Sequence, residues 1–482
     1  MLFNSIDFAI FLPIVFGVYW WLSRFNNLFQ NAFIVFASYT FYSWWDPRFL
    51  ALIVISSLVD FVIGLKLRNE ERDRIRKYLL GISVSANLII LFVFKYYNFF
   101  VDNLSSVLLA FGLSVQFKYL NVLLPIGISF YTFQTLSYTI DVYKRKIEPT
   151  SNLFAFLAFV SFFPQLVAGP IERASNLLPQ FTTKRSFNYI LSIDGLRQML
   201  WGLFKKIVIA DRCGIYADLI FNNSSLYSGS TLVLGAMFFS IQIYADLSGY
   251  SDIAIGCSKL FGFRLSRNFS FPYFSRDIAE FWRRWHISLS TWFRDYVYIP
   301  LGGGRGGTSM KVRNIFLIFI LSGFWHGASW TFIIWGVLHA IFYLPLLLTK
   351  TNRKHLDTIA TEKVLPSLKH VILILKTFML VSLSWIFFRA NNLEHAMDYL
   401  SGICSASLFE VPYFEGIKRA MLICLGIMGF MLIEWAGRHN SYAIERIGNV
   451  LNKSARYAVY YLMIVLIWLS YSNPEPYIYF QF

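Results

Sequence analysis

Residues 315–349 read IFLIFILSGFWHGASWTFIIWGVLHAIFYLPLLLT, a stretch of 35 residues without Asp, Glu, Lys or Arg. As one continuous helix this stretch would be about 52 Å long, whereas the hydrocarbon core of a bilayer is about 30 Å thick. We therefore predict two membrane spans, with a break at Ser322-Gly323 or at Gly327. Irregular backbone at membrane depth is tolerated only where it packs in protein or lines a cavity. The stretch thus predicts a helical membrane protein with an interior break beside His326.

The composition of the whole chain also indicates a membrane protein. Of its 482 residues, 56% are hydrophobic, 19% are aromatic and only 15% are charged, against about 25% charged residues in soluble domains. A soluble fold could not bury so much apolar surface, and the strands of a transmembrane β-barrel would alternate apolar and polar residues. These numbers exclude a soluble enzyme, a disordered protein and a β-barrel. They predict an all-α polytopic membrane protein with a single domain over residues 1–482.

Apolar stretches long enough to cross a bilayer recur along the chain and predict about ten to twelve transmembrane helices. Some of the shorter ones end in charged residues that can reach the interface. The stretches lie at residues 8–21, 25–45, 49–65, 79–94, 119–140, 150–171, 219–245, 371–388, 420–433 and 457–474.

The charges indicate an orientation in the membrane. The segments 66–77 and 144–146 are rich in Lys and Arg, and such segments favour the cytoplasmic side. Three spans precede the first segment, so the N-terminus is expected outside. The N-terminal residues MLFNSIDFAIFLPIVF lack a basic start and a cleavage site, so we expect a retained span. We interpret the net charge of +16 as an orientation signal and expect the lipid bilayer, not nucleic acid, as the partner.

Residues 259–313 differ from the rest, with ten basic and three acidic residues interleaved with aromatic ones. The segment is too polar to span, so an amphipathic or re-entrant segment at headgroup level is expected. On one helix, Arg283 and His286 would share a face. Two interpretations stay open here. One is a polar site near a basic entrance for an acidic or phosphorylated ligand, and the other is a belt of side chains facing lipid headgroups.

Ionisable residues inside apolar stretches are candidate functional residues. His326 in LSGFWHGASW is the first candidate, with a packed histidine as the alternative, and His339 is expected to be a packing residue. Asp246 and Asp252 either face a water-filled cavity or end a helix at headgroup level. Asp60 is expected to be a structural hydrogen-bond or ion-pair partner. The four cysteines lack metal-ligand spacing, so no metal site is expected.

Several long motifs occur in the order found in a known family. The chain resembles the membrane-bound O-acyltransferases, in particular the bacterial branch with alginate O-acetylation, peptidoglycan O-acetylation and teichoic-acid D-alanylation proteins. The core motifs lie within about residues 120–345. They are LPIGISFYTFQTLSYTIDVY (124–143), FFPQLVAGPIER (162–173), YADLSGYSDIAIG (244–256), FWRRWHISLSTWFRDYVYIPLGG (281–303) and SGFWHGASWTFIIWGVLHA (322–340).

The resemblance implies a ring of transmembrane helices around a thin central region that is pierced by a tunnel. On the matching motifs, the family's histidine is His326, and its second polar position is His286. The donor would be an acyl thioester, either acetyl-CoA or the phosphopantetheine arm of an acyl carrier, and no permanently bound cofactor is expected. The resemblance further implies a bacterial cytoplasmic membrane location and an extracytoplasmic SGNH-type acetyltransferase partner. An acyl carrier protein is a further candidate partner.

This reaction suggests a role for each candidate residue. His326 would be the general base on an acceptor hydroxyl, since a neutral imidazole supplies such a base within about 3 Å of the proton it takes. His286 would orient the thioester or stabilise the oxyanion. Arg283, Arg284 and Arg294 are candidates for binding donor phosphates, although headgroup binding would explain them equally.

The C-terminal residues YIYFQF give a further candidate. By resemblance to an aromatic motif on a small partner in the teichoic-acid system, Tyr479 could accept and relay an acyl group. The alternative is an anchoring tail, since aromatic residues favour the membrane interface.

Two other functions stay open at this point. One is D-alanyl transfer to teichoic acid. The other is a transporter or flippase of a lipid-linked glycan, although the internal repeats typical of transporters are not visible.

Overall fold

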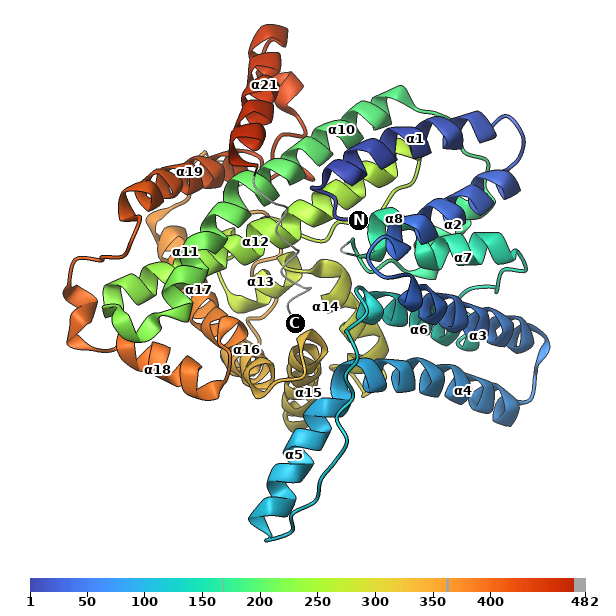
Figure 1. Cartoon of the computed structure of the whole chain (residues 1–482), viewed down its shortest axis with the longest axis horizontal. Coiled ribbons are helices and arrows are strands. Elements are labelled where there is room, and N and C mark those ends of the chain that lie inside the picture. Colours follow the sequence, from blue (N-terminus) through green and yellow to red (C-terminus); the bar gives the residue numbers. More distant parts are fainter. Residues whose placement is uncertain (168, 361–363, 472–482) are drawn as a thin grey trace. The chain divides into compact units, whose positions relative to one another are not determined.

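The computed structural model describes residues 1–167, 169–360 and 364–471, and throughout these residues the regular structure is helical, without a strand (Figure 1). Six helices in the described part of the chain are long and apolar enough to cross a membrane, and two shorter apolar helices accompany them. The predicted all-α membrane architecture is therefore confirmed. The six are Pro47–Asn69, Asp73–Ala110, Gly229–Leu260, Trp330–Leu348, Leu368–Arg389 and Ile417–Ala436, and the shorter ones are Ile6–Leu22 and Leu153–Leu166.

The chain forms two compact units, of which the first comprises Met1–Ser192 and Cys257–Ser266. Tyr19 and Trp20 of its first helix donate hydrogen bonds to the carbonyl oxygens of Phe261 and Leu260, both at 3.0 Å. The helices of this unit are α1 (Ile6–Leu22), α2 (Asn27–Ser43), α3 (Leu50–Asn69), α4 (Asp73–Leu91), α5 (Tyr97–Ala110), α6 (Ile128–Tyr143), α7 (Leu153–Ser161), α8 (Phe163–Leu166) and α9 (Ala174–Thr182).

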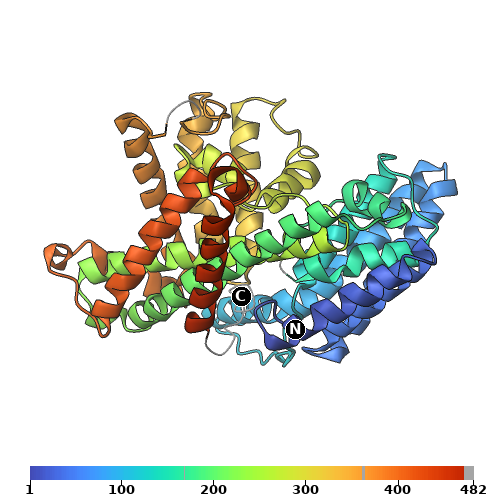
Figure 2. The same ribbon diagram turned by 90° about the horizontal axis from the view of Figure 1, so that it is seen from above.

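Helices α3, α4 and α6 lie side by side and enclose a buried carboxylate (Figures 1 and 2). Asp60 of α3 is fully buried. It accepts hydrogen bonds from Ser83, from Asn87 at 2.8 Å and from Thr139 at 3.1 Å. These three partners lie on α4 and α6, so the carboxylate joins three helices. The predicted structural role of Asp60 as a hydrogen-bond partner is confirmed.

Three predicted spans are interrupted in the structure. In 119–140, helix α6 begins only at Ile128, after Pro125 and after Gly127 at φ +75°. The stretch 150–171 divides at Phe162 into α7 and the short α8, which has a proline in its first turn. The stretch 219–245 divides between α11 (Asp211–Asn222) and α12 (Gly229–Leu260). In each case the expectation counted charges and overlooked Pro, Gly or Asn as helix breakers.

The second compact unit comprises Ile193–Gly256 and the chain from Arg267 onwards. Its helices are α10 (Tyr189–Leu203, which begins before residue 193), η3 (Phe204–Ala210), α11 (Asp211–Asn222), α12 (Gly229–Leu260, which ends beyond residue 256), α13 (Ile278–Arg284), α14 (Ile287–Phe293), η6 (Arg294–Tyr298), α15 (Thr308–His326), α16 (Trp330–Leu348), α17 (Leu368–Arg389), α18 (Leu393–Ile403), α19 (Ile417–Ala436), α20 (Ile447–Val450) and α21 (Lys453–Ser470).

Helices α15 and α16 form a tight hairpin. The helical stretch breaks at Gly327, which is one of the two positions predicted for the break. The other position, Ser322-Gly323, is helical. A Cβ atom on Gly323 would lie 2.2 Å from the carbonyl oxygen of Phe332, and one on Gly336 would lie 2.2 Å from that of Phe319. Only glycine fits at both positions, because Cβ atoms do not approach other atoms this closely. The two backbones therefore touch directly.

A buried charge network joins η3 to α12. Lys205 contacts Asp252 at 2.5 Å, and Lys206 contacts Asp246 at 2.7 Å and Asp211 at 2.8 Å. Both lysine side chains are 3% exposed. Helix α12 continues past both aspartates to Leu260. The helix-end alternative is therefore wrong for Asp246 and Asp252, whereas the cavity alternative stays a prediction, since Asp252 lines a small pocket together with Lys205 and Glu434.

Candidate active site

His326 is the last residue of α15, directly before the break, and is 4% exposed. Aromatic rings surround its imidazole. The ring centroids of Trp325, Trp335 and Phe388 lie 5.0, 5.1 and 5.2 Å away, and all three rings stand edge-on to it. Trp335 comes from α16 and Phe388 from α17. Three helices thus meet around one ionisable side chain.

His286 lies between α13 and α14, each only seven residues long and so about 10 Å, too short to span. Its backbone is left-handed, with φ +41° and ψ +55°, which is uncommon for residues other than glycine. Arg283 and His286 therefore do not share one helix, and the prediction of a common face is wrong. Burial lowers the pKa of His286 to about 3, so the imidazole is neutral at pH 7.

The segment around His286 is buried inside the second unit. Phe281 and Trp285 are 1% exposed and His286 is 2% exposed. These three side chains therefore do not form a belt facing lipid headgroups, whereas the depth of the segment in the membrane stays a prediction. The physical reason is that the aromatic side chains of α13 pack against α16 and α17, as the contacts of Trp285 with Trp385 and of Phe281 with His339 show.

The indole of Trp325 lies next to both candidate histidines. Its ring centroid is 5.0 Å from that of His326 and 6.2 Å from that of His286. The structure therefore brings together the two residues that the sequence singled out, although 40 positions separate them. Two imidazoles beside one indole, buried from solvent, can hold a proton donor and a proton acceptor in fixed positions.

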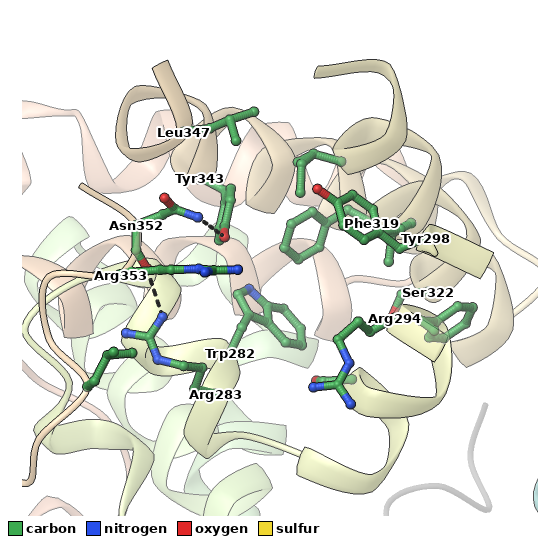
Figure 3. Close-up of a pocket in the computed structure, with 15 residues that line it drawn as sticks. Trp282, Arg283, Arg294, Tyr298, Phe319, Ser322, Tyr343, Leu347, Asn352 and Arg353 are labelled. Carbon is green, nitrogen blue, oxygen red and sulfur yellow. Dashed lines mark hydrogen bonds between the residues drawn. The ribbon is translucent and has the colours of Figure 1, made fainter. Parts of the chain in front are cut away.

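A cavity of about 520 Å³ lies beside α13 (Figure 3). Ser322, one helical turn before His326, belongs to its wall, so the cavity extends close to the candidate base. Figure 3 shows Arg294 and Arg353 on either side of Trp282. The lining is mainly aromatic and aliphatic, with three arginines and no acidic residue: Trp282, Arg283, Ser290, Phe293, Arg294, Tyr298, Ile315, Ile318, Phe319, Ser322, Tyr343, Leu347, Asn352, Arg353 and Leu356.

The three predicted arginines occupy different environments. Arg283 lines the cavity but donates to the carbonyl oxygens of Asn352 at 2.9 Å and His355 at 2.7 Å. Arg284 is turned away from the cavity and pairs with Glu280 at 2.8 Å. Arg294 lines the cavity with its side chain 59% exposed. Of the three, Arg294 is thus the arginine most accessible to a ligand.

His339 contacts Trp282, which lines the cavity. Trp282 Nε1 donates to His339 Nδ1 at 3.2 Å, so the proton of the neutral ring sits on Nε2, 2.9 Å from Ser384 Oγ. His339 is fully buried and 4.9 Å from the ring of Trp335, which also contacts His326. The predicted packing role of His339 is confirmed.

The variant His339→Leu is expected to lose about 1–3 kcal/mol of unfolding free energy, because the partly buried Trp282 loses the acceptor of its N–H. Unfolding of the detergent-solubilised protein measures this loss. His439→Leu, on the exposed His439, is the control and should unfold like the wild type. Equal stability of all three proteins would contradict this role.

Sequence reasoning missed several residues of this region. Trp325 and Trp335 lie inside motifs that carried the family resemblance, yet they were not singled out, although tryptophans flanking a histidine were a visible signal. Arg353 gave no signal because it lies outside the matching motifs, 59 positions after Arg294. Tyr479 lies outside the described residues.

The chain is similar in sequence to known proteins. The sequence model of MBOAT, the membrane-bound O-acyltransferase family, matches residues 36–375. A probable alginate O-acetylase AlgI of Pseudomonas aeruginosa is 43% identical over 448 residues, which cover 92% of this chain and 82% of that protein. A peptidoglycan O-acetyltransferase of Helicobacter pylori is 37% identical, over 84% of this chain and 80% of that protein. A teichoic acid D-alanyltransferase of Bacillus subtilis is 29% identical, over 57% of this chain and 71% of that protein.

Proposed function

Because this chain belongs to the membrane-bound O-acyltransferase family, we propose that it passes an acetyl group from a cytoplasmic thioester through the membrane to a cell-envelope polysaccharide. The resemblance predicted from the sequence is confirmed, and the protein is a multi-pass membrane O-acyltransferase. The donor, the acetyl group and the direction of transfer are parts of the proposal.

Acetyl transfer is favoured over D-alanyl transfer by two observations. The two relatives named for O-acetylation match 92% and 84% of this chain, whereas the D-alanyltransferase matches 57%. A D-alanyl group carries an ammonium, which a carboxylate would bind, and the described cavity lining contains arginines but no carboxylate.

The observation that carries the proposal is the burial of His326 at the break between α15 and α16. The ring of Trp325 lies next to both His326 and His286. A neutral imidazole in such a site can act as a general base. The acceptor hydroxyl oxygen would attack the thioester carbonyl carbon while His326 takes the hydroxyl proton. When the C–S bond breaks, the same proton returns from His326 to the leaving thiolate. An N–H of His286 would stabilise the oxyanion between these steps.

The cavity beside α13 is the proposed donor site. Its apolar interior suits the carbon chain of a pantetheine arm, and the cationic groups of Arg294 and Arg353 suit phosphates. Ser322 connects the cavity wall to the turn of α15 that ends at His326. A thioester bound there would point its acyl end towards the base.

The variants Arg294→Glu and Arg353→Glu are expected to raise the donor KM about tenfold each, with kcat changed less than twofold, because phosphate binding precedes the chemistry. Initial rates with varied acetyl-CoA measure both constants. Arg305→Glu makes the same charge change on an exposed residue outside the cavity. An equal rise in KM for this control would exclude a specific phosphate site.

Vesicles test the proposed function. Right-side-out membrane vesicles that contain this chain and an extracytoplasmic SGNH-type acetyltransferase would be loaded with labelled acetyl-CoA or a labelled acetyl carrier protein. Base-labile label on polysaccharide outside the vesicles would support the proposal. The donor that gives more of this label is then identified as the more effective one. Release of a lipid-linked glycan without ester formation would indicate the flippase alternative. No external ester with either donor would refute the proposal.

The location and topology belong to the same proposal. The basic segments 66–77 and 144–146 support a cytoplasmic membrane protein with its N-terminus outside. Cysteine labelling from outside, at residue 2 and at residue 146, tests this arrangement. Labelling at residue 146 alone would invert the topology.

A further inference from the structure

The left-handed backbone of His286 places this residue at the N-cap of α14, where a helix needs acceptors for its first N–H groups. An N-cap residue usually supplies such an acceptor from its own side chain, and Ser, Thr, Asp and Asn are preferred there. His286 makes no such cap. Its ring lies instead near Phe269 and Trp325, with centroid distances of 5.9 and 6.2 Å. The acceptors must therefore come from elsewhere.

Asn268 supplies them from a segment 20 residues away. Its backbone carbonyl accepts the N–H of Ile287 at 2.8 Å. Its side-chain Oδ1 accepts the N–H of Ser288 at 3.3 Å and the hydroxyl of Ser288 at 2.9 Å. The first two N–H groups of α14 are thus satisfied by one residue that is not part of the helix.

The carboxamide of Asn268 is itself held in one orientation. Its Nδ2 donates to Ser251 Oγ of α12 at 3.1 Å. Because the N–H of Ser288 can only donate, Oδ1 must face α14 and Nδ2 must face α12. Asn268 and Ser251 are each 3% exposed, so water does not compete for these bonds.

Ser270, two residues after Asn268, also holds the turn at His286, through Arg284. The N–H of Ser270 donates to the carbonyl of Arg284 at 2.9 Å, and Arg284 Nη1 donates to the carbonyl of Ser270 at 3.3 Å. Residues 268–270 therefore clamp the chain on both sides of His286. A residue in the left-handed region persists only where surrounding contacts hold it, and this clamp provides such contacts.

We propose that Asn268 is a positioning residue that caps α14 in place of His286 and so fixes the turn that carries the imidazole of the acyl-transfer site. The proposal rests on the proposed role of His286. Asn268 does not touch the reacting atoms in this scheme. It acts by fixing the turn, and a displacement of about 1 Å in a catalytic group can cost about 100-fold in rate.

The test is a double-mutant cycle in cells where this chain replaces the resident enzyme, with base-labile acetate on envelope polysaccharide measured per amount of folded membrane protein. Asn268→Leu keeps the size of the side chain without its acceptors and should lower transfer about 100-fold. Asn268→Asp keeps the acceptors and should stay within about threefold of the wild type. In the His286→Ala background, Asn268→Leu should cause no further loss.

A matched control removes a helix cap elsewhere. Asn392 caps α18 with its own side chain, which accepts the N–H of His395 at 2.8 Å. Asn392→Leu should leave transfer unchanged. If Asn268→Leu does not fold, Ser251→Ala replaces it, because loss of its oxygen removes the bond that holds Asn268 Nδ2 towards α12. Ser251→Ala should lower transfer about threefold in the wild-type background. In the His286→Ala background it should cause no further loss.

Four outcomes would overturn the inference: independent losses that multiply in the cycle, full activity of Asn268→Leu, an inactive Asn268→Asp, or full activity of His286→Ala. In all four, an inactive His326→Ala would leave the proposed function in place. Full activity of His326→Ala would refute the proposed mechanism instead, so the two failures are distinguishable.

Discussion

Replacement of His326 by alanine is expected to lower ester transfer about 10³-fold, with the protein still folded in the membrane. General base catalysis contributes about 10²–10⁴-fold. The imidazole is 4% exposed and enclosed by Trp325, Trp335 and Phe388. Neither the indoles nor the phenyl ring can accept the proton in place of the imidazole. Base-labile acetate on envelope polysaccharide, normalised to membrane protein, measures the loss.

Two comparisons make this prediction specific. His326→Gln keeps a hydrogen-bonding side chain of similar length but cannot take up a proton at neutral pH, so it should be as inactive as His326→Ala. His439→Ala, on the exposed His439, should transfer normally. Retained transfer in His326→Gln would show that the residue holds structure and does not move a proton.

The variant Lys206→Met is expected to cost about 3–5 kcal/mol of unfolding free energy, the largest stability effect we predict. Lys206 is the cation shared by Asp211 and Asp246, at 2.8 and 2.7 Å. Removal of one partner of a buried ion pair leaves its charge uncompensated, which is the costly case. Denaturant unfolding of the purified protein in detergent measures the change.

Two further variants separate this cause from a simple loss of packing. The triple variant Lys206→Met, Asp211→Asn, Asp246→Asn removes the charges together and should be more stable than Lys206→Met alone. Lys146 pairs with Asp141 at 3.7 Å with its own side chain 56% exposed. Lys146→Met should therefore cost at most about 1 kcal/mol. Equal losses for Lys146→Met and Lys206→Met would contradict the argument.

The sequence predicted those features that depend on composition and local pattern. The break at Gly327 followed from a stretch too long to be one span, and His326 followed from an ionisable group at that break. The motifs identified the family. The interrupted span at 119–140 could also have been predicted, since Pro125 and Gly127 lie within it.

The features that the sequence did not predict depend on partners distant in the chain. The turn at His286 is held by Asn268, which belongs to no recognisable capping pattern because it caps a helix 20 residues ahead. Lys205 and Lys206 lie next to each other in the sequence, but Asp252 and Asp246 lie 47 and 40 residues later on α12, and only Asp211 is close in the chain. Charge patterning indicates that such groups need partners and does not identify them.

The direct backbone contact of α15 with α16 limits what can reach His326. At Gly323 and Gly336 there is no side chain whose rotation could separate the helices. This wall therefore cannot retreat to admit a wider group. Any engineered tolerance for longer or branched acyl chains should come from shortening Phe388 or Trp325, whose rings form the other boundaries of the imidazole. If His326 is the base, as proposed, we expect this hairpin to be the rigid side of the site.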